Sequence, residues 1–421
     1  MDHFEEYKSD RKVMGKPLLE DDANPFLEIE GEISPAILEI QLTWSNLTYK
    51  IPSTNKVLLK DLKGSASAGS ILAIMGPSGS GKTTLINLLA GNRPIRHIVT
   101  GGIYANEVPI NSFPYKHLAA YVMQTDLLMS RLTPREVLTF SVNMRTTLHP
   151  HQKEARVESI LRELKLEKVA NNVIGSILDR GLSGGERKRV SIGVEMITKP
   201  SILLLDEPTS GLDSVAAELI IELLKEEAKR GMTIITTIHQ PSVNVFNMLD
   251  DLLLLSNGLE VYQGKASHSE EYFEQIGFVC PSLTNPADYF MKILFIQNKN
   301  QLTEKEIEVL EFFEKCAKEK THKIKHSTSG IDLKAIQPPP MPTKLRKFKY
   351  VFKRTVRSLT RSKDLTVVKL GQFIILGILG DLVYYNLGNS AEAFQNYNGF
   401  LFFATSTTIM MPVQNAILAC M

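Results

Sequence analysis

One nine-residue stretch, Gly76 to Thr84 (GPSGSGKTT), constrains the fold of this 421-residue chain most strongly. It follows a short apolar run at 71–75 and precedes the amphipathic segment 85–90, so a strand, a glycine-rich loop and a helix are expected in that order. Such a loop turns backbone N–H groups around phosphate oxygens, and the positive end of the following helix points at the same phosphates. The sequence therefore predicts an α/β P-loop nucleotide-binding fold.

The loop assigns a role to each of its residues. Lys82 is expected to reach the β- and γ-phosphates of ATP, and the Thr83 hydroxyl is expected to hold Mg²⁺. The remaining residues supply the phosphate cradle: Gly76, Pro77, Ser78, Gly79, Ser80, Gly81 and Thr84.

Two adjacent carboxylates follow a second apolar strand, at 201–205. A carboxylate beside Mg²⁺ can hold the water shell of the metal, and a second one can accept a proton from the attacking water. We assign Asp206 to the first role and Glu207 to the second.

Polar side chains also end two other predicted strands. Gln124 follows 119–123 and is placed to touch Mg²⁺ or water, and His239 follows 232–238 and is placed to bond the γ-phosphate. Tyr49, in an expected edge strand at 38–51, is a candidate for stacking on adenine; the alternative is a ring packed on a sheet face.

A second anion-ready helix start lies at Ser183-Gly184-Gly185, followed by Glu186. Between the two glycine loops, Thr133-Pro134-Arg135-Glu136 has the pattern of a capping box, and residues 134–168 are expected to form two helices broken near His149-Pro150. The loop after Glu207 ends at Asp213, where another amphipathic helix begins. The sequence thus predicts a helical insert between the two halves of the nucleotide site.

The last quarter of the chain changes character. Residues 344–363 carry nine Lys and Arg and no Asp or Glu, with aromatic and aliphatic residues interleaved, which suits an anionic membrane surface better than nucleic acid. An almost wholly apolar stretch follows at 370–387, interrupted by Gln372 and Asp381, and a second follows at 399–421. Eighteen helical residues span about 27 Å, enough for a bilayer core, and the basic cluster before the first span places the N-terminal side in the cytoplasm.

Composition agrees with a cytoplasmic domain joined to membrane helices. The net charge of +2 does not indicate a nucleic-acid partner. Three widely spaced cysteines (280, 316 and 420) match no metal spacing and suggest a reducing compartment. Residues 1–22 lack the apolar core of a signal peptide.

The motifs in this order resemble the nucleotide-binding domain of an ABC transporter. They correspond to Walker A (Gly76–Thr84), the Q-loop (Gln124), the signature (Leu182–Glu186), Walker B (Leu203–Glu207), the D-loop (Ser210–Asp213) and the H-loop (His239). The signature is close to diagnostic of ABC proteins. Ser-Gly-Gly-Glu-Arg-Lys-Arg, the Asn285–Phe290 motif, and a nucleotide-binding domain ahead of the membrane part resemble the G (white/brown) subfamily.

The resemblance implies a domain plan: a flexible tail (1–35), an ABC nucleotide-binding domain (36–296) with a helical subdomain at about 130–190, a linker (297–343), a basic connecting helix (344–364) and the start of a transmembrane domain (365–421, with spans at about 368–388 and 399–421). The last part resembles the first two of six membrane helices in the family, so a truncated half-transporter or a fragment is expected.

The resemblance also implies a mechanism. Two half-transporters, identical or related, pair so that Lys82, Glu207 and the other ATP residues of one subunit face Ser183, Gly184 and Gly185 of its partner. ATP hydrolysis with Mg²⁺ then drives export of a lipid-like or other small molecule across the membrane. Two alternatives stay open: a non-transporting or regulatory subunit, and a soluble-type ABC ATPase, against which the apolar spans argue.

Overall fold

A computed structural model describes residues 37–92, 94, 96–175, 181–295, 333, 340–361, 363–385, 395–406 and 409 of the 421-residue chain. The predicted tail at 1–35, nearly all of the linker at 297–343, and much of the second span at 399–421 lie outside the described residues.

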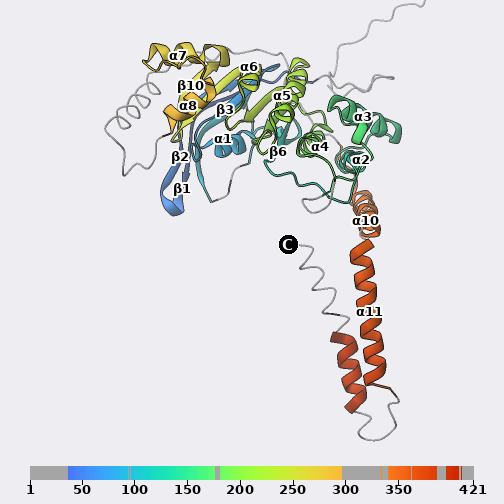
Figure 1. Cartoon of the computed structure of the whole chain (residues 1–421). Helices are drawn as coiled ribbons and strands as arrows, with labels where there is room; N and C mark the ends of the chain where they lie inside the picture. The colour runs from blue at the N-terminus through green and yellow to red at the C-terminus, as the bar shows by residue number, and fades with distance from the viewer. Residues whose placement is uncertain are drawn as a thin grey trace, which may run out of the picture.

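A six-stranded sheet, ordered β10-β9-β3-β8-β7-β6, forms the centre of the nucleotide-binding domain (Figure 1). Its strands are β3 (Ile71–Met75), β6 (Ala119–Val122), β7 (Ile202–Leu205), β8 (Thr233–Thr237), β9 (Asp251–Ser256) and β10 (Leu259–Lys265). Neighbouring strands are parallel, except that β10 runs antiparallel to β9. A parallel sheet is covered on both faces, which is why its strands read as continuous apolar runs.

A second, antiparallel sheet has the order β2-β1-β4-β5, built from β1 (Leu42–Ile51), β2 (Lys56–Ala66), β4 (Ile98–Ala105) and β5 (Val108–Pro109). The expectation of an edge strand at 38–51 is wrong, because β1 pairs with both β2 and β4. The register shifts between Trp44 and Leu47, and Asn46 has a φ of 51°. This bulge interrupts the alternation of buried and exposed residues along β1, so the sequence lacks the regular pattern expected of a strand that pairs on both sides.

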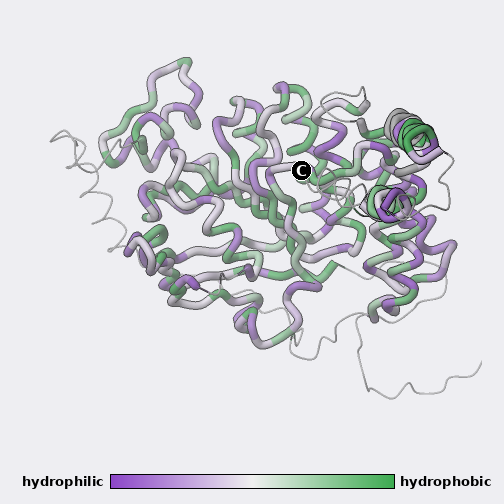
Figure 2. The backbone as a smooth tube through the Cα atoms, turned by 90° about the horizontal axis from the view of Figure 1, so that it is seen from below, coloured by the Kyte–Doolittle hydropathy of each residue, from purple (hydrophilic) through white to green (hydrophobic). Residues whose placement is uncertain are grey.

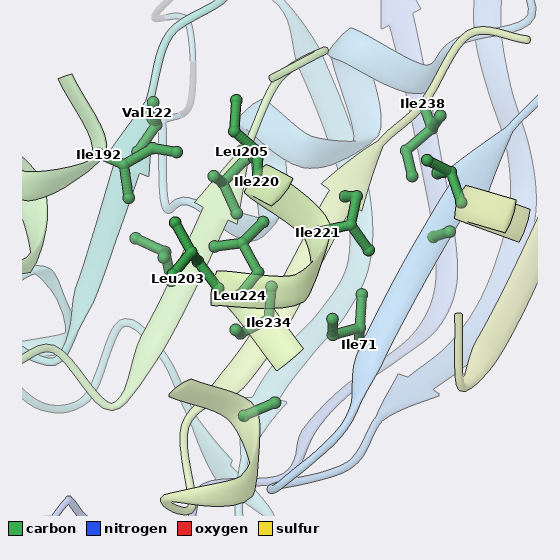
Figure 3. Packing of buried hydrophobic residues seen from close by; sticks show 14 of the residues in the cluster. Ile71, Val122, Ile192, Leu203, Leu205, Ile220, Ile221, Leu224, Ile234 and Ile238 are labelled. Atoms are coloured by element: carbon green, nitrogen blue, oxygen red, sulfur yellow. The ribbon is translucent and has the colours of Figure 1, made fainter. Parts of the chain in front are cut away.

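Alternate residues of β3 belong to two different hydrophobic cores. Ile71, Ala73 and Met75 join a cluster with the covering helices, whereas Leu72 and Ile74 join a cluster with α1 (Lys82–Leu89) and the antiparallel sheet. Figure 3 shows the first cluster, where Leu203, Leu205 and Ile234 of the sheet lie against Ile220, Ile221 and Leu224 of α5 (Ser214–Lys229). The period-two alternation of a strand therefore separates the two layers.

The helical insert consists of α2 (Pro134–Arg145) and α3 (Pro150–Glu163), and α4 (Gly184–Met196) packs against both. The capping box is confirmed, since the Glu136 N–H donates to Thr133 Oγ1 and the Thr133 N–H donates to the Glu136 carboxylate. The predicted break at His149-Pro150 is confirmed as well. Figure 2 shows hydrophobic residues through the middle of the domain and hydrophilic residues gathered on helices at its rim.

Short helices complete the domain: α6 (Val243–Met248), α7 (Ser269–Gln275), α8 (Pro286–Leu294), and the 3-10 turns η1 (Pro52–Thr54), η2 (Tyr115–His117), η3 (Glu167–Val169) and η4 (Ala266–His268).

The turn of the β9–β10 hairpin contacts the backbone of the glycine loop. Its turn is Asn257-Gly258, where the Gly258 N–H donates to Ser80 O at 3.0 Å and the Lys60 N–H donates to Gly258 O at 2.8 Å. Gly258 has a φ of +77°, and a Cβ there would lie 2.2 Å from Leu58 O. Backbone–backbone contact of this kind leaves no side chain that can move aside.

We therefore expect Gly258→Ala to destabilise the domain by clearly more than the roughly 1–2 kcal/mol of left-handed strain alone. Gly277→Ala is the matched control, because Gly277 has a φ of +92° but open space at its Cβ position. Thermal unfolding of both variants checks this; equal losses of melting temperature would refute the backbone clash as the cause.

Beyond the domain, α10 (Lys344–Arg361) and α11 (Lys363–Val383) extend away beneath α2, and a helix at 395–406 lies beside α11 (Figure 1). The Tyr384 and Phe400 rings meet with centroids 5.5 Å apart. Within the residues described, no helix combines the length and apolarity needed to cross a membrane. Asp381 lies in the last turn of α11 and is exposed.

Candidate nucleotide-binding and catalytic site

The glycine loop is closed around the Lys82 side chain. Lys82 Nζ donates to Gly76 O at 2.7 Å and to Pro77 O at 3.0 Å, and only 6 % of the residue is exposed. Burial lowers the pKa of Lys82, against the opposing pull of the Glu207 and Asp206 carboxylates. The cation is thus held inside the loop, facing the two acids that follow β7.

The loop fits a polyphosphate. Ser80 Oγ is buried and has no hydrogen-bond partner among the described residues, so a polar group is left for a ligand oxygen. Gly79, with a φ of +80°, has open space at its Cβ position. Ser78 and Gly79 are exposed at the loop surface, and Thr84 follows Lys82 and Thr83 in the first turn of α1.

Asp206 is held by three hydroxyl groups. Thr237 Oγ1 donates to Asp206 Oδ1 at 2.7 Å, Thr83 Oγ1 lies 3.4 Å from the same oxygen, and Tyr121 OH donates to Oδ2 at 3.3 Å. Burial, together with the charge of Asp206, raises the pKa of Tyr121, so the phenol stays a donor. Hydroxyl and carboxylate oxygens are the ligands that Mg²⁺ prefers, so Thr83 and Asp206 form a suitable pair for it.

The Glu207 carboxylate lies next to the Gln124 amide. Gln124 Nε2 donates to Glu207 Oε2 at 2.8 Å, and both side chains come from carboxyl ends of neighbouring parts of the sheet. Glu207 has a φ of +45°, an unusual conformation for a residue with a side chain. Its N–H donates to Thr237 Oγ1 at 2.8 Å.

The signature segment caps α4. The Glu186 N–H donates to Ser183 Oγ and the Ser183 N–H donates to the Glu186 carboxylate, so Gly184 and Gly185 begin the helix with exposed Ser183 at its cap. Lys188, farther along α4, is buried; its Nζ donates to Gln124 O at 2.7 Å and pairs with Asp126 at 2.7 Å. The Q-loop and the signature helix are therefore joined through Lys188.

The remaining predicted residues lie around this edge. Asp213 caps α5 by accepting from the Ala216 N–H at 2.9 Å. His239 is exposed just after β8. The preceding residue, Ile238, donates its N–H to Ile74 O near the end of β3, so His239 lies at the same edge of the sheet as the start of the glycine loop. Tyr49 is 6 % exposed and belongs to the second core, with its ring edge-on to His97 and its hydroxyl hydrogen-bonded to His97 Nδ1. That placement matches the alternative of a ring packed on the sheet.

Three residues of the site were missed from the sequence: Thr237, Tyr121 and Lys188. Thr237 lies two positions before His239 and is the residue of β8 that comes level with Asp206, one step beyond the Leu205–Thr236 pair. Parallel strand register supplies this signal, but only once the strand order is known.

The helical subdomain also docks the basic helix α10. Arg361 binds both oxygens of Glu136, at 2.6 and 2.8 Å, and Arg357 donates to Glu136 Oε1 at 3.1 Å. Arg354 lies over the Phe140 ring, 4.3 Å from its centroid. Burial raises the pKa of Glu136, but the Arg361 and Thr133 hydrogen bonds and the charges of Arg361 and Arg357 more than offset it, so the pKa lies below the usual value of a glutamate.

We expect Glu136→Gln to loosen α10 from α2, because the neutral amide loses charge-assisted bonds to two arginines. A carboxyl whose pKa is depressed on docking stabilises the contact above its undocked pKa, and that stability is lost as pH falls through the docked value. Lower protection of the amide hydrogens in 344–361, corrected for the intrinsic exchange rate at each pH, checks this for the variant and for the wild type at acidic pH. Unchanged exchange would contradict it; Glu154→Gln, at an exposed site, is the control.

Comparison with known proteins agrees with this geometry. A family described as ABC transporter matches residues 59–210, and two families described as ABC-2 type transporter match residues 239–312 and 346–420. The chain is similar in sequence to ABC transporters of the G subfamily. It is 34 % identical over 402 residues to the mouse broad substrate specificity ATP-binding cassette transporter ABCG2, covering 87 % of this chain and 61 % of that protein.

Other G-family proteins are similar as well. ABC transporter G family member 20 of Arabidopsis thaliana is 35 % identical over 375 residues, covering 84 % of this chain and 50 % of that protein. Member 1 of Dictyostelium discoideum is 42 % identical over 266 residues, covering 62 % of this chain and 33 % of that protein. The chain thus spans only about half of the length of such relatives. A solved ATP-binding cassette of an ABC transporter, MJ1267 in its ADP conformation, is 25 % identical with a TM-score of 0.47, covering 56 % of this chain and 99 % of that structure.

Proposed function

We propose that this chain is an ATP-hydrolysing subunit that pairs with a second ABC half-transporter and drives export of a lipid-like or other small molecule. The observation that carries the proposal is the position of Glu207. Its carboxylate accepts a hydrogen bond from Gln124 at 2.8 Å, beside a buried lysine and a hydroxyl-bound Asp206 at one sheet edge. One base, one metal-binding acid and one phosphate-binding cation are the parts that phosphoryl transfer to water requires.

Bound ATP supplies the phosphoanhydride bond, and Mg²⁺ offsets the charge of its phosphates. Thr83, Asp206 and Gln124 would hold the metal, partly through water. Lys82 and the backbone of Gly76–Thr84 would bind and orient the phosphates, and His239 would fix the terminal one. Glu207 would take the proton from the water that Gln124 orients. Asp213 would contact the partner chain across the dimer.

The second subunit completes the site in this proposal. Ser183 is the exposed N-cap of α4, and Gly184 and Gly185 are the first two residues of that helix. A helix N-terminus exposed in this way favours an anion. We infer that it faces the γ-phosphate held by the partner, so that two ATP molecules are enclosed between two chains.

The basic face of α10, the apolar α11 and the match to ABC-2 type transporter domains support a place in a membrane, with several spans and the nucleotide-binding domain in the cytoplasm.

The test is ATP-dependent uptake of a lipid-analogue panel into inside-out vesicles that hold the chain with its co-expressed half-transporters. Uptake that needs hydrolysable ATP supports the proposal. If ATP is hydrolysed but no analogue is taken up with any candidate partner, the proposed export function is rejected and the proposed ATPase activity is kept.

A further inference from the structure

A buried hydroxyl at the end of β8 connects the two acids of the site. Thr237 has no exposed surface, and its Oγ1 lies 2.7 Å from Asp206 Oδ1 and 2.8 Å from the Glu207 nitrogen. The amide N–H can only donate, so Thr237 accepts there and its single proton goes to the carboxylate. The direction of both bonds is thus fixed by chemistry.

This arrangement acts on a strained part of the backbone. Glu207 has a φ of +45°, which costs a residue with a side chain on the order of 1–2 kcal/mol and persists only where the surroundings hold it. The bond from the Glu207 N–H to Thr237 fixes the peptide plane between Asp206 and Glu207. The same oxygen fixes the Asp206 carboxylate, so one side chain sets the two acids relative to each other.

We propose that Thr237 is a positioning residue for ATP hydrolysis, which aims Glu207 by holding its backbone and at the same time orients Asp206. The proposal rests on the proposed ATPase function and adds to it a residue outside every motif of the site. Thr237 touches neither phosphate nor water in this scheme, so its loss misplaces the base without removing it. A misplacement of about 1 Å can cost about 100-fold in rate.

The adjacent residue offers a matched control. Thr236 is equally buried on the same strand, but among the described residues its hydroxyl bonds only the neighbouring backbone, at Thr237 O, 3.4 Å away. Thr236→Val and Thr237→Val are therefore the same chemical change, one residue apart. Thr237→Ser keeps the hydroxyl and removes only the methyl group.

The experiment compares these three variants in the full chain. We expect Thr237→Val to lower kcat for ATP about 10- to 100-fold with KM changed less than about 3-fold, and Thr237→Ser and Thr236→Val to stay near the wild type. A second readout needs no nucleotide: the Glu207 amide should exchange its hydrogen at least about 10-fold faster in Thr237→Val and at the wild-type rate in the other two.

Each result decides one point. Equal kcat losses in the Val variant, which lacks the hydroxyl, and in the Ser variant, which keeps it, would mean that the packing of the whole side chain and not the hydroxyl bonds sets the rate, which overturns the proposal. Wild-type exchange at Glu207 in Thr237→Val would also overturn it, even if that variant is inactive. If the wild type itself does not hydrolyse ATP, the proposed function fails, while the exchange readout still tests the role of Thr237 in holding Glu207. If Thr237→Val does not fold, Thr237→Ser and Thr236→Val decide: a loss of kcat in either one contradicts the proposal.

Discussion

Glu207→Gln is expected to bind ATP with near wild-type affinity and to hydrolyse it at least about 100-fold more slowly, because the attacking water loses its base. The glutamine keeps an oxygen that can accept the 2.8 Å hydrogen bond from Gln124, so the local structure should survive the change. Phosphate release under saturating Mg-ATP, beside equilibrium binding of a fluorescent ATP analogue, measures the two effects separately.

The control for Glu207 is the exposed Glu154, where glutamine should leave turnover unchanged. Turnover of Glu207→Gln within about threefold of the wild type would remove this residue from the role of base, since general-base catalysis contributes about 100-fold or more. Equal loss of binding and turnover would instead indicate a structural effect.

Lys82→Ala is expected to weaken ATP binding itself, by about 10-fold or more. The side chain now bonds Gly76 O and Pro77 O and faces Asp206 and Glu207, so its removal leaves two acids near the phosphates without a cation between them. A charge-assisted contact to phosphate contributes on the order of 1.5–3 kcal/mol, which corresponds to this loss.

Equilibrium binding of ATP to Lys82→Ala and to Lys116→Ala, an exposed lysine, provides the comparison. Only the first should lose affinity. Unchanged affinity in Lys82→Ala would contradict the assignment of the glycine loop as the phosphate site.

The grouping of the candidate site residues at one edge of the sheet could be predicted, because each of these residues follows a strand or begins a helix. Asp206, Glu207, Gln124 and His239 follow strands of one parallel sheet, so a linear reading already placed them at the same edge. The capping box at Thr133 was equally visible, since both partners lie within four residues, whereas the same arrangement at Ser183 and Glu186 was read only as an anion-binding helix start.

Long-range contacts could not be predicted in this way. Thr237 reaches Asp206 and Glu207 because β8 pairs with β7, and this strand order cannot be predicted from the sequence pattern of either strand. The docking of α10 joins Glu136 to Arg361, 225 residues apart, and nothing in the pattern of either segment names the other. The bulge at Asn46 hid an interior strand for a different reason, because an extra residue shifts the alternation of the side chains.

Side-chain contacts give a continuous path from the Glu207 carboxylate to α10. Gln124 bonds Glu207, Lys188 of α4 bonds the Q-loop backbone, and α4 meets α2 through an ion pair of Arg145 and Glu195 at 2.7 Å. At its other end, α2 presents Glu136 to Arg361 of α10. A hydrolysis-driven shift of the helical subdomain would therefore move α10.

The composite site between two chains is the central claim, and a disulfide tests it most directly. Ser78 and Ser183 are exposed, on the glycine loop and at the start of α4, and cysteine is close to serine in size. In a Glu207→Gln chain with its own three cysteines replaced by serine, cysteines at positions 78 and 183 should oxidise with Mg-ATP to a species of twice the 47.1 kDa chain mass, and not without nucleotide. A chain that binds ATP and yet forms no such cross-link would contradict the account.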